Sequence, residues 1–174
     1  MLKRGCVVLL TALALAGCDD DSPTAPSDPN VVMFTAQLSA ANEVPPITGT
    51  EANARGDVRI TFNLTRDSAN NVSGATVNFT VNLTSFPNNT SWILAHIHEG
   101  GSGVAGPVRI NTKLTPATAI TLTSGSISNQ QFTSDPVTDV TLINNIISNP
   151  AGFYFNVHTS VNQGGAVRGQ LVRQ

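Results

Sequence analysis

The sequence predicts an all-β fold, an antiparallel β-sandwich of immunoglobulin-like general type, and three observations support this prediction. From residue 31 onward, apolar and polar residues alternate with a period of two, which is typical of strands that bury one face. Turn-forming residues separate the alternating segments. Threonine, asparagine and valine are abundant, and stretches of strong helix formers are missing. Many short antiparallel strands in one chain favour a sandwich.

Three segments carry the clearest strand pattern, because each has an unbroken apolar row that alternates with polar residues. The rows consist of Phe34, Ala36 and Leu38, then Val58, Ile60, Phe62 and Leu64, and then Val77, Phe79, Val81 and Leu83. Each row is expected to face the core, and the polar residues between its members are expected to face water. Further strands are expected at residues 91–98, 107–111, 119–123, 152–158 and 166–172.

One segment, residues 138–148, departs from the period of two. Its apolar residues recur at the spacing of a helix face, at Val140, Ile143 and Ile147. Asp139 precedes them as a suitable N-terminal cap, and Pro150 follows as a helix stop. We therefore expect one short helix near residues 138–148 that links two strands.

Length and composition indicate one domain and exclude several classes of protein. The chain has 174 residues, of which 40% are hydrophobic and 11% are charged. Soluble domains carry roughly 25% charged residues, so a charge-rich disordered chain and a Glu/Lys-rich coiled coil are excluded. The formal net charge is −2, and the one basic run is Lys3-Arg4. No nucleic-acid partner is expected, because phosphate binding requires a basic surface.

Residues 1–17 resemble a lipoprotein signal peptide. Lys3 and Arg4 form a basic start, and residues 7–16 form an apolar stretch that is too short to cross a bilayer of about 30 Å as a helix. The letters LAGC, ending at Cys18, resemble a bacterial lipobox, whose cysteine is diacylated and becomes the mature N-terminus. The alternative is an ordinary secretory signal followed by a chance cysteine.

Residues 18–30 are acidic and proline-rich, and they are expected to form a solvated tether ahead of a domain at residues 31–174. The only other cysteine, Cys6, lies inside the signal peptide, so the domain has no thiol for a disulfide, a nucleophile or a metal ligand. These features imply an extracytoplasmic domain of the cell envelope, anchored to a bacterial membrane through a lipid on Cys18.

The three histidines are the main candidates for chemistry. His96 and His98 lie two residues apart in an expected strand, so their side chains project from one face, about 7 Å apart along the chain. His158 lies in another expected strand, on the polar face that it shares with Tyr154 and Asn156. Such a set could bind copper or zinc. Candidates to support these ligands are Tyr154, Asn156 and Glu99.

A structural role is the alternative for the same histidines. They would then hydrogen-bond to loop backbone and hold the glycine-rich loop at residues 99–107 in place. In the alternating pattern, His96 and His98 are expected to share their face with Trp92 and Leu94.

Two acidic residues and one arginine have competing interpretations. Glu43 and Glu99 could serve a hydrolase as a carboxylate pair, or they could be a turn cap and a loop charge, and nothing in the sequence brings them together. The guanidinium of Arg168 could bind a carboxylate or backbone carbonyls in a bidentate manner. Structural pairing with Glu43 or Glu99 is preferred here over ligand binding.

Three segments in order resemble the CHRD domain, a family named from chordin. They are LSAANEVPP at 38–46, AHIHEGGSGVAGPV at 95–108 and GFYFNVHTSVNQGGAVRGQL at 152–171. The resemblance covers about residues 31–174 and implies a β-rich domain, whose bacterial relatives are commonly secreted proteins or lipoproteins. The signature residues of the family fall here on Glu43, Pro45, His96, His98, Asn156, His158, Thr159, Arg168 and Gly169.

The AHIHEGG stretch is also similar to a histidine-bearing strand of copper/zinc superoxide dismutases, but the further ligands and the disulfide of that family have no matching positions. Two functions are therefore expected as alternatives. The first is a non-enzymatic binding or structural module of the envelope with a protein or glycan partner. The second is a domain that binds copper or zinc through histidines and is redox-active by analogy. The sequence identifies no catalytic residues.

Overall fold

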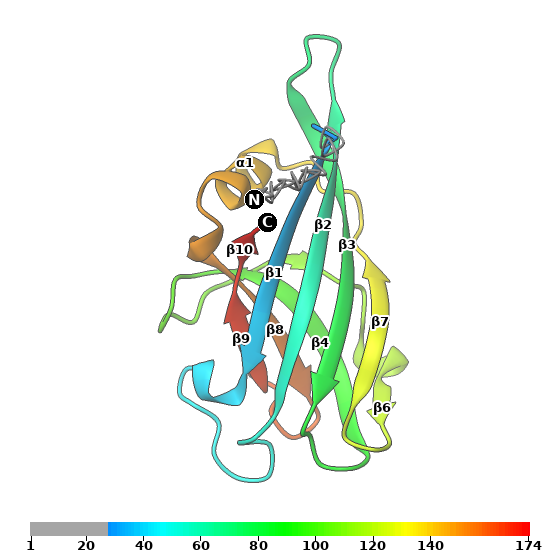
Figure 1. The fold of residues 1–174 in the computed structure, drawn as a ribbon, viewed down its shortest axis with the longest axis vertical. Helices are drawn as coiled ribbons and strands as arrows, with labels where there is room; N and C mark the ends of the chain where they lie inside the picture. The colour runs from blue at the N-terminus through cyan, green and yellow to red at the C-terminus, as the bar shows by residue number, and fades with distance from the viewer. Residues whose placement is uncertain (1–27) are drawn as a thin grey trace, which may run out of the picture.

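The computed structural model describes residues 28–174, in which one antiparallel sheet contains all the strands (Figure 1). The predicted signal peptide, Cys18 and the tether up to residue 27 lie outside the described residues. The strands are β1 (Val31–Ser39), β2 (Arg55–Arg66), β3 (Val72–Thr84), β4 (Thr90–Glu99), β5 (Val108–Asn111), β6 (Ile120–Leu122), β7 (Ile127–Thr133), β8 (Phe153–Thr159), β9 (Val167–Gln170) and β10 (Val172–Arg173). One helix, α1 (Val140–Ser148), and three short 3₁₀ turns at Ala40–Asn42, Pro116–Thr118 and Pro150–Gly152 complete the elements.

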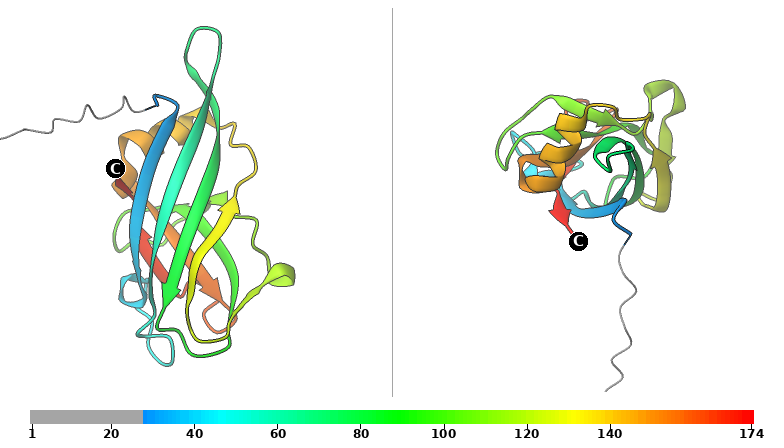
Figure 2. Two further views of the ribbon diagram at one scale, coloured as in Figure 1. Left: turned by 45° about the vertical axis from the view of Figure 1, so that its right-hand side comes forward. Right: turned by 90° about the horizontal axis from the view of Figure 1, so that it is seen from above.

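The sheet has the strand order β5-β4-β8-β9-β1-β2-β3-β7, with β10 paired to β1 and β6 paired to β4. It curls over so that its two halves face each other, as the end-on view in Figure 2 shows. Phe79 of β3 lies 5.6 Å from Phe155 of β8, and Trp92 of β4 lies 5.2 Å from Phe132 of β7, measured between ring centroids. These strands are not neighbours in the sheet, so the contacts cross the core. The predicted all-β sandwich is confirmed, and its two layers are parts of one sheet.

The core consists of the apolar rows that the sequence predicts. The rows of β1, β2 and β3 are buried, and the polar residues between them face outward or are half-buried. The core row of β8 consists of Phe153, Phe155 and Val157, of which each is at most 3% exposed. Burial of large apolar side chains contributes about 1.5–3 kcal/mol each, so these rows account for much of the driving force for folding.

The predicted helix is present, with its buried face rotated from the expected one. Asp139 caps it, because its Oδ1 accepts a hydrogen bond from the backbone N–H of Leu142 at 2.9 Å. The buried residues are Leu142, Ile143 and Ile146, while Val140 and Ile147 are half-buried at the flanks. The helix packs against β3. No helix of the described part of the chain is long and apolar enough to cross a membrane.

Three strand expectations need correction. The sequence did not indicate β7, because this edge strand is mostly polar and contributes little to the core beyond Ile127 and Phe132. The expected strand at 166–172 is divided at Leu171 into β9, which pairs with β8, and β10, which pairs with β1. Trp92 points into the core rather than toward the histidines, because the register shifts between Trp92 and Leu94 and reverses the alternation there.

Candidate functional site

The face of β4 and β8 that points away from the core carries all three histidines. His96 lies opposite Asn156 in the register of these strands, and Leu94 lies opposite His158. Each histidine is no more than 7% exposed, although this face is not the core face. The loops after β4 and β8 contact the rings of His98 and His158, and the turn after β1 contacts Arg168 on the same face. This face of the sheet is therefore buried although it is polar.

Two of the histidine rings are oriented by loop carbonyls. The Nδ1 of His98 lies 2.9 Å from the carbonyl oxygen of Gly106, and the Nδ1 of His158 lies 2.8 Å from that of Gln163. A carbonyl oxygen can only accept a hydrogen bond, so both Nδ1 atoms must carry the proton. The Nε2 atoms of these two neutral rings therefore bear lone pairs. This arrangement is common for histidines that bind a metal.

One nitrogen from each of the three rings lies within 4.8 Å of the others. The Nδ1 of His96 lies 3.2 Å from the Nε2 of His158. Two imidazole nitrogens that share a tetrahedral zinc ion at about 2.0–2.1 Å are separated by about 3.3 Å. The Nε2 of His98 is buried and has no hydrogen-bond partner. The three side chains therefore converge as ligands of one metal ion would.

Burial keeps the three rings neutral at neutral pH. Desolvation, together with the nearby rings of His158 and His98, lowers the pKa of His96 to about 4. Desolvation also lowers the pKa of His98 and that of His158, although the carbonyl of each ring's loop opposes the shift. Since only a neutral imidazole has a lone pair for a metal, the environment favours the state that can bind one.

Tyr154 and Arg168 form a stacked column beside the histidines. The ring of Tyr154 stacks on His98 at 4.9 Å between centroids, and the Cζ of Arg168 lies 4.5 Å from the centroid of the Tyr154 ring. The hydroxyl of Tyr154 accepts a hydrogen bond from the N–H of Gly106. Tyr154 therefore fixes both the His98 ring and the loop residue to which that ring donates.

Arg168 joins two loops through their carbonyls. Its Nε donates to the oxygen of Asn42 at 2.6 Å and its Nη1 donates to the oxygen of Val104 at 3.0 Å. These contacts take the place of the ion pair with Glu43 or Glu99 that the sequence suggested. The carboxylate of Glu99 is half exposed and pairs with Arg109 at 3.1 Å instead.

Glu43 is buried on the inner side of its loop, with 6% of its surface exposed. Burial raises its pKa to about 7, and the positive charge of Arg168 opposes part of that rise. Glu43 and Glu99 lie in different surroundings, so the structure does not bring them together as a carboxylate pair.

Thr159 belongs to a separate contact beside the site. Its hydroxyl donates to the Oε2 of Glu51 at 2.8 Å, and the side-chain amide of Asn162 donates to the same oxygen at 2.6 Å. Glu51 is fully buried and ties the loop after β8 to the loop before β2. Glu51 could not be predicted from the sequence, because a single glutamate in a polar loop gives no local signal.

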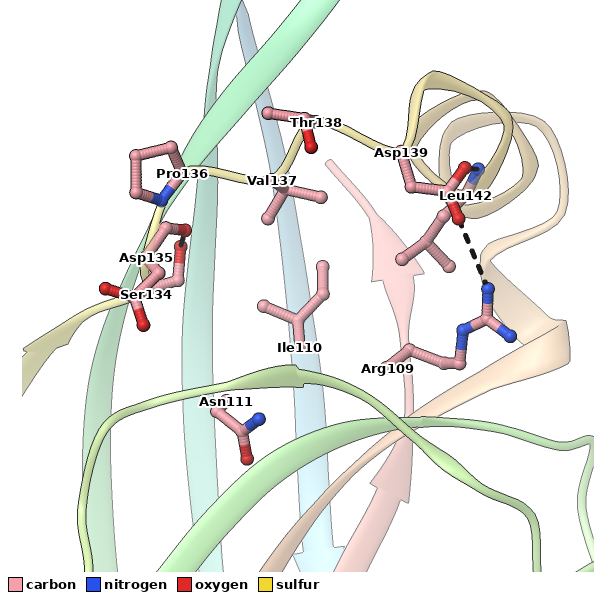
Figure 3. A pocket seen from close by; sticks show the side chains of 10 residues that line it. All are labelled: Arg109, Ile110, Asn111, Ser134, Asp135, Pro136, Val137, Thr138, Asp139 and Leu142. Atoms are coloured by element: carbon pink, nitrogen blue, oxygen red, sulfur yellow. Dashed lines mark hydrogen bonds and ion pairs between the residues drawn. The ribbon is translucent and has the colours of Figure 1, made fainter.

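A hollow with a volume of about 290 Å³ lies on another part of the surface (Figure 3). Arg109 and Asp139 lie at one side of it, 3.5 Å apart between Nη2 and Oδ2. Ile110, Val137 and Leu142 contribute apolar surface to it. No histidine lines this hollow, so the chemistry described above is confined to the face of β4 and β8.

The motifs that hold the site together are those of a known family. The family model of the CHRD domain matches residues 34–171, which is most of the chain. The match includes every histidine, Glu43 and Arg168. No curated protein and no solved structure matches the chain significantly. The chain therefore belongs to the CHRD domain family.

Proposed function

We propose that this CHRD domain is a non-enzymatic binding module of the cell envelope that holds one copper or zinc ion through His96, His98 and His158. The observation that carries the proposal is the inward Nε2 of His98, which is buried, has no partner and is a hydrogen-bond acceptor because its Nδ1 donates to Gly106. Burial of a polar nitrogen without a hydrogen-bond partner costs about 1–3 kcal/mol. If His98 served only to hold its loop, this cost for its Nε2 would bring no gain.

The choice of metal follows from the donor set. Three imidazoles suit zinc and copper, whereas magnesium and calcium require oxygen ligands. Three protein ligands also leave a fourth position open to water or another small ligand. The described residues supply no thiolate, since both cysteines of the chain precede residue 28.

The proposal is tested by elemental analysis of the full chain, purified from cells, stripped of metal and dialysed against zinc or copper. We expect about one ion per chain in the wild type and a large loss in His96→Ala, with circular dichroism confirming that both proteins are folded. If the folded wild type retains neither ion, the metal proposal is wrong, and a module for a protein or glycan partner becomes the better account.

We further infer that the chain is anchored to a bacterial membrane by a lipid on Cys18. The basic start, the short apolar stretch and the LAGC motif support this inference. Cys18→Ser is expected to move the chain from the detergent-soluble membrane fraction to the aqueous fraction. Equal membrane association of Cys18→Ser and wild type would contradict the lipid anchor.

A further inference from the structure

Asn156 lies on the polar face that carries the histidines, and its amide oxygen is buried without a partner. The side chain is 2% exposed, and among residues 28–174 its Oδ1 has no hydrogen-bond partner. More than about 90% of buried polar groups in proteins are paired, so this oxygen is an exception. An amide oxygen can only accept, and it therefore binds either a hydrogen-bond donor or a cation.

Strand register places Asn156 next to two of the histidines. It lies directly opposite His96 of β4 and two residues before His158 on β8, so the three side chains project from one face. Residues directly opposite each other on antiparallel strands have Cβ atoms about 4.5–5.5 Å apart. The side chain of Asn156 therefore starts beside the pair of nitrogens, Nδ1 of His96 and Nε2 of His158, that lie 3.2 Å apart.

Glu43 and Gly165 indicate which way the amide of Asn156 is turned. A Cβ added to Gly165 would lie 2.7 Å from Nδ2 of Asn156 and 2.7 Å from Oε2 of Glu43, so the amide nitrogen lies on the side of this loop. A donor nitrogen beside a carboxylate supports this assignment of the two amide atoms. Oδ1 is on the other branch of the amide and points away from Gly165.

Arg168 does not use this oxygen, although it lies opposite Asn156 on β9. Within the described part of the chain, Nη2 of Arg168 also lacks a partner, so the nearest donor on that side is not bonded to Oδ1. The strand on the other side of β8 is β4, which carries His96 and His98. The oxygen is therefore left to the side of the face where the ring nitrogens converge.

The ring of His96 sets how far the converging nitrogens lie from the strands. It faces the cluster with Nδ1, whereas His98 and His158 present Nε2. Nδ1 of a histidine and Oδ1 of an asparagine are each two bonds from Cβ, so on directly opposite residues they reach equally far from the sheet. An ion bound to Nδ1 of His96 is thus within reach of Asn156. Oxygen ligands of zinc lie at about 2.0–2.2 Å.

We propose that the amide oxygen of Asn156 is the fourth ligand of the ion that His96, His98 and His158 hold. This inference rests on the metal site proposed above and deepens it, because a fourth protein ligand closes the coordination sphere. Structural zinc sites have four protein ligands, whereas catalytic sites keep one position for water or substrate. A closed site agrees with a non-enzymatic module and makes the ion a structural part of this face.

The test is an azide titration of the full chain loaded with one equivalent of Co²⁺, whose visible spectrum reports changes in its ligands. We expect Asn156→Ala to bind azide with a saturable spectral change. The wild type is expected to bind azide at least about tenfold more weakly, because azide can bind only the fraction of molecules in which Asn156 has left the ion. Asn111→Ala is the matched control, since Asn111 lies opposite His96 on β5 but is exposed, and it is expected to behave as the wild type.

A second variant, Asn156→Asp, tests the same point if Asn156→Ala does not fold. It keeps the size of the side chain and replaces the amide oxygen by a carboxylate oxygen, which is a common zinc ligand. We expect Asn156→Asp to bind Zn²⁺ at least as tightly as the wild type in competition with a chelator. Asn156→Ala is expected to bind it at least about tenfold more weakly.

Two results would overturn the fourth ligand and leave the three histidines in place. Equal azide affinity of the wild type and Asn156→Ala would show that the fourth position is open, with Oδ1 accepting from a bound water instead. Weaker zinc binding by folded Asn156→Asp would show that this side chain does not face the ion. A folded wild type that binds neither Co²⁺ nor Zn²⁺ would remove the metal site itself, and the fourth ligand with it.

Discussion

Replacing His98 by glutamine is expected to lower the affinity of the chain for Zn²⁺ by more than about 100-fold. Loss of a hydrogen-bond partner behind a metal ligand already costs about 10–100-fold in affinity, and loss of the ligand itself costs more. Glutamine is close in size to histidine, and its amide can still donate to the carbonyl of Gly106, so the loop contact can be kept while the imidazole is removed. Competition with a chromophoric chelator measures the change.

Glu99→Gln is the matched control for this experiment. Glu99 follows His98 in the chain, but its carboxylate points to Arg109 at the surface. We expect its zinc affinity to equal that of the wild type within a factor of two. An equal affinity of His98→Gln and Glu99→Gln would show that His98 is not a ligand.

Glu43→Gln is expected to stabilise the fold by about 3 kcal/mol at pH 8 and to have little effect at pH 4. The pKa of Glu43 is raised from 4.5 to about 7 in the folded chain. Below pH 4.5 the carboxyl is protonated in both states, so its contribution to stability is fully present. As the pH rises toward 7, the Glu43 carboxyl ionises in the unfolded chain before it ionises in the folded one. The free energy of unfolding therefore falls by about 1.4 kcal/mol per pH unit. Glutamine removes this loss.

Chemical denaturation of both proteins at pH 4, 6 and 8 measures the difference. The histidines act in the opposite sense, because the folded pKa of His96 is lowered from 6.5 to about 4. Their stability contribution is present above pH 6.5 and is lost as the pH falls toward 4. Both proteins contain the same histidines, so this contribution cancels in the comparison. A difference between the two proteins that stays constant from pH 4 to pH 8 would refute the raised pKa.

Most strands could be predicted from sequence, because a strand that buries one face has apolar and polar residues in alternation. The rows through Phe34, Ile60 and Phe79 show this pattern, and all three residues lie in the core. The pattern fails where an extra residue shifts the register, as it does at Trp92, and where an edge strand needs little apolar surface, as in β7. Neither a bulge nor an edge can be read from alternation alone.

The composition of the site was predictable in part. The spacing of His96 and His98 places them on one face, and Asn156 and His158 share a face for the same reason. The alternating pattern does not predict the strand register, which sets Leu94 opposite His158 and so brings the ring of His158 close to those of His96 and His98. The burial of Glu43 and Glu51 depends on long loops folding back over the sheet, which no local pattern specifies.

The most direct test of the central claim is X-ray absorption spectroscopy at the zinc edge of the full chain loaded with one equivalent of Zn²⁺. We expect three imidazole nitrogens at about 2.0–2.1 Å from the zinc and one further light atom in the open position. Imidazole scattering from fewer than three rings, or zinc surrounded by oxygen atoms alone, would contradict a site formed by His96, His98 and His158.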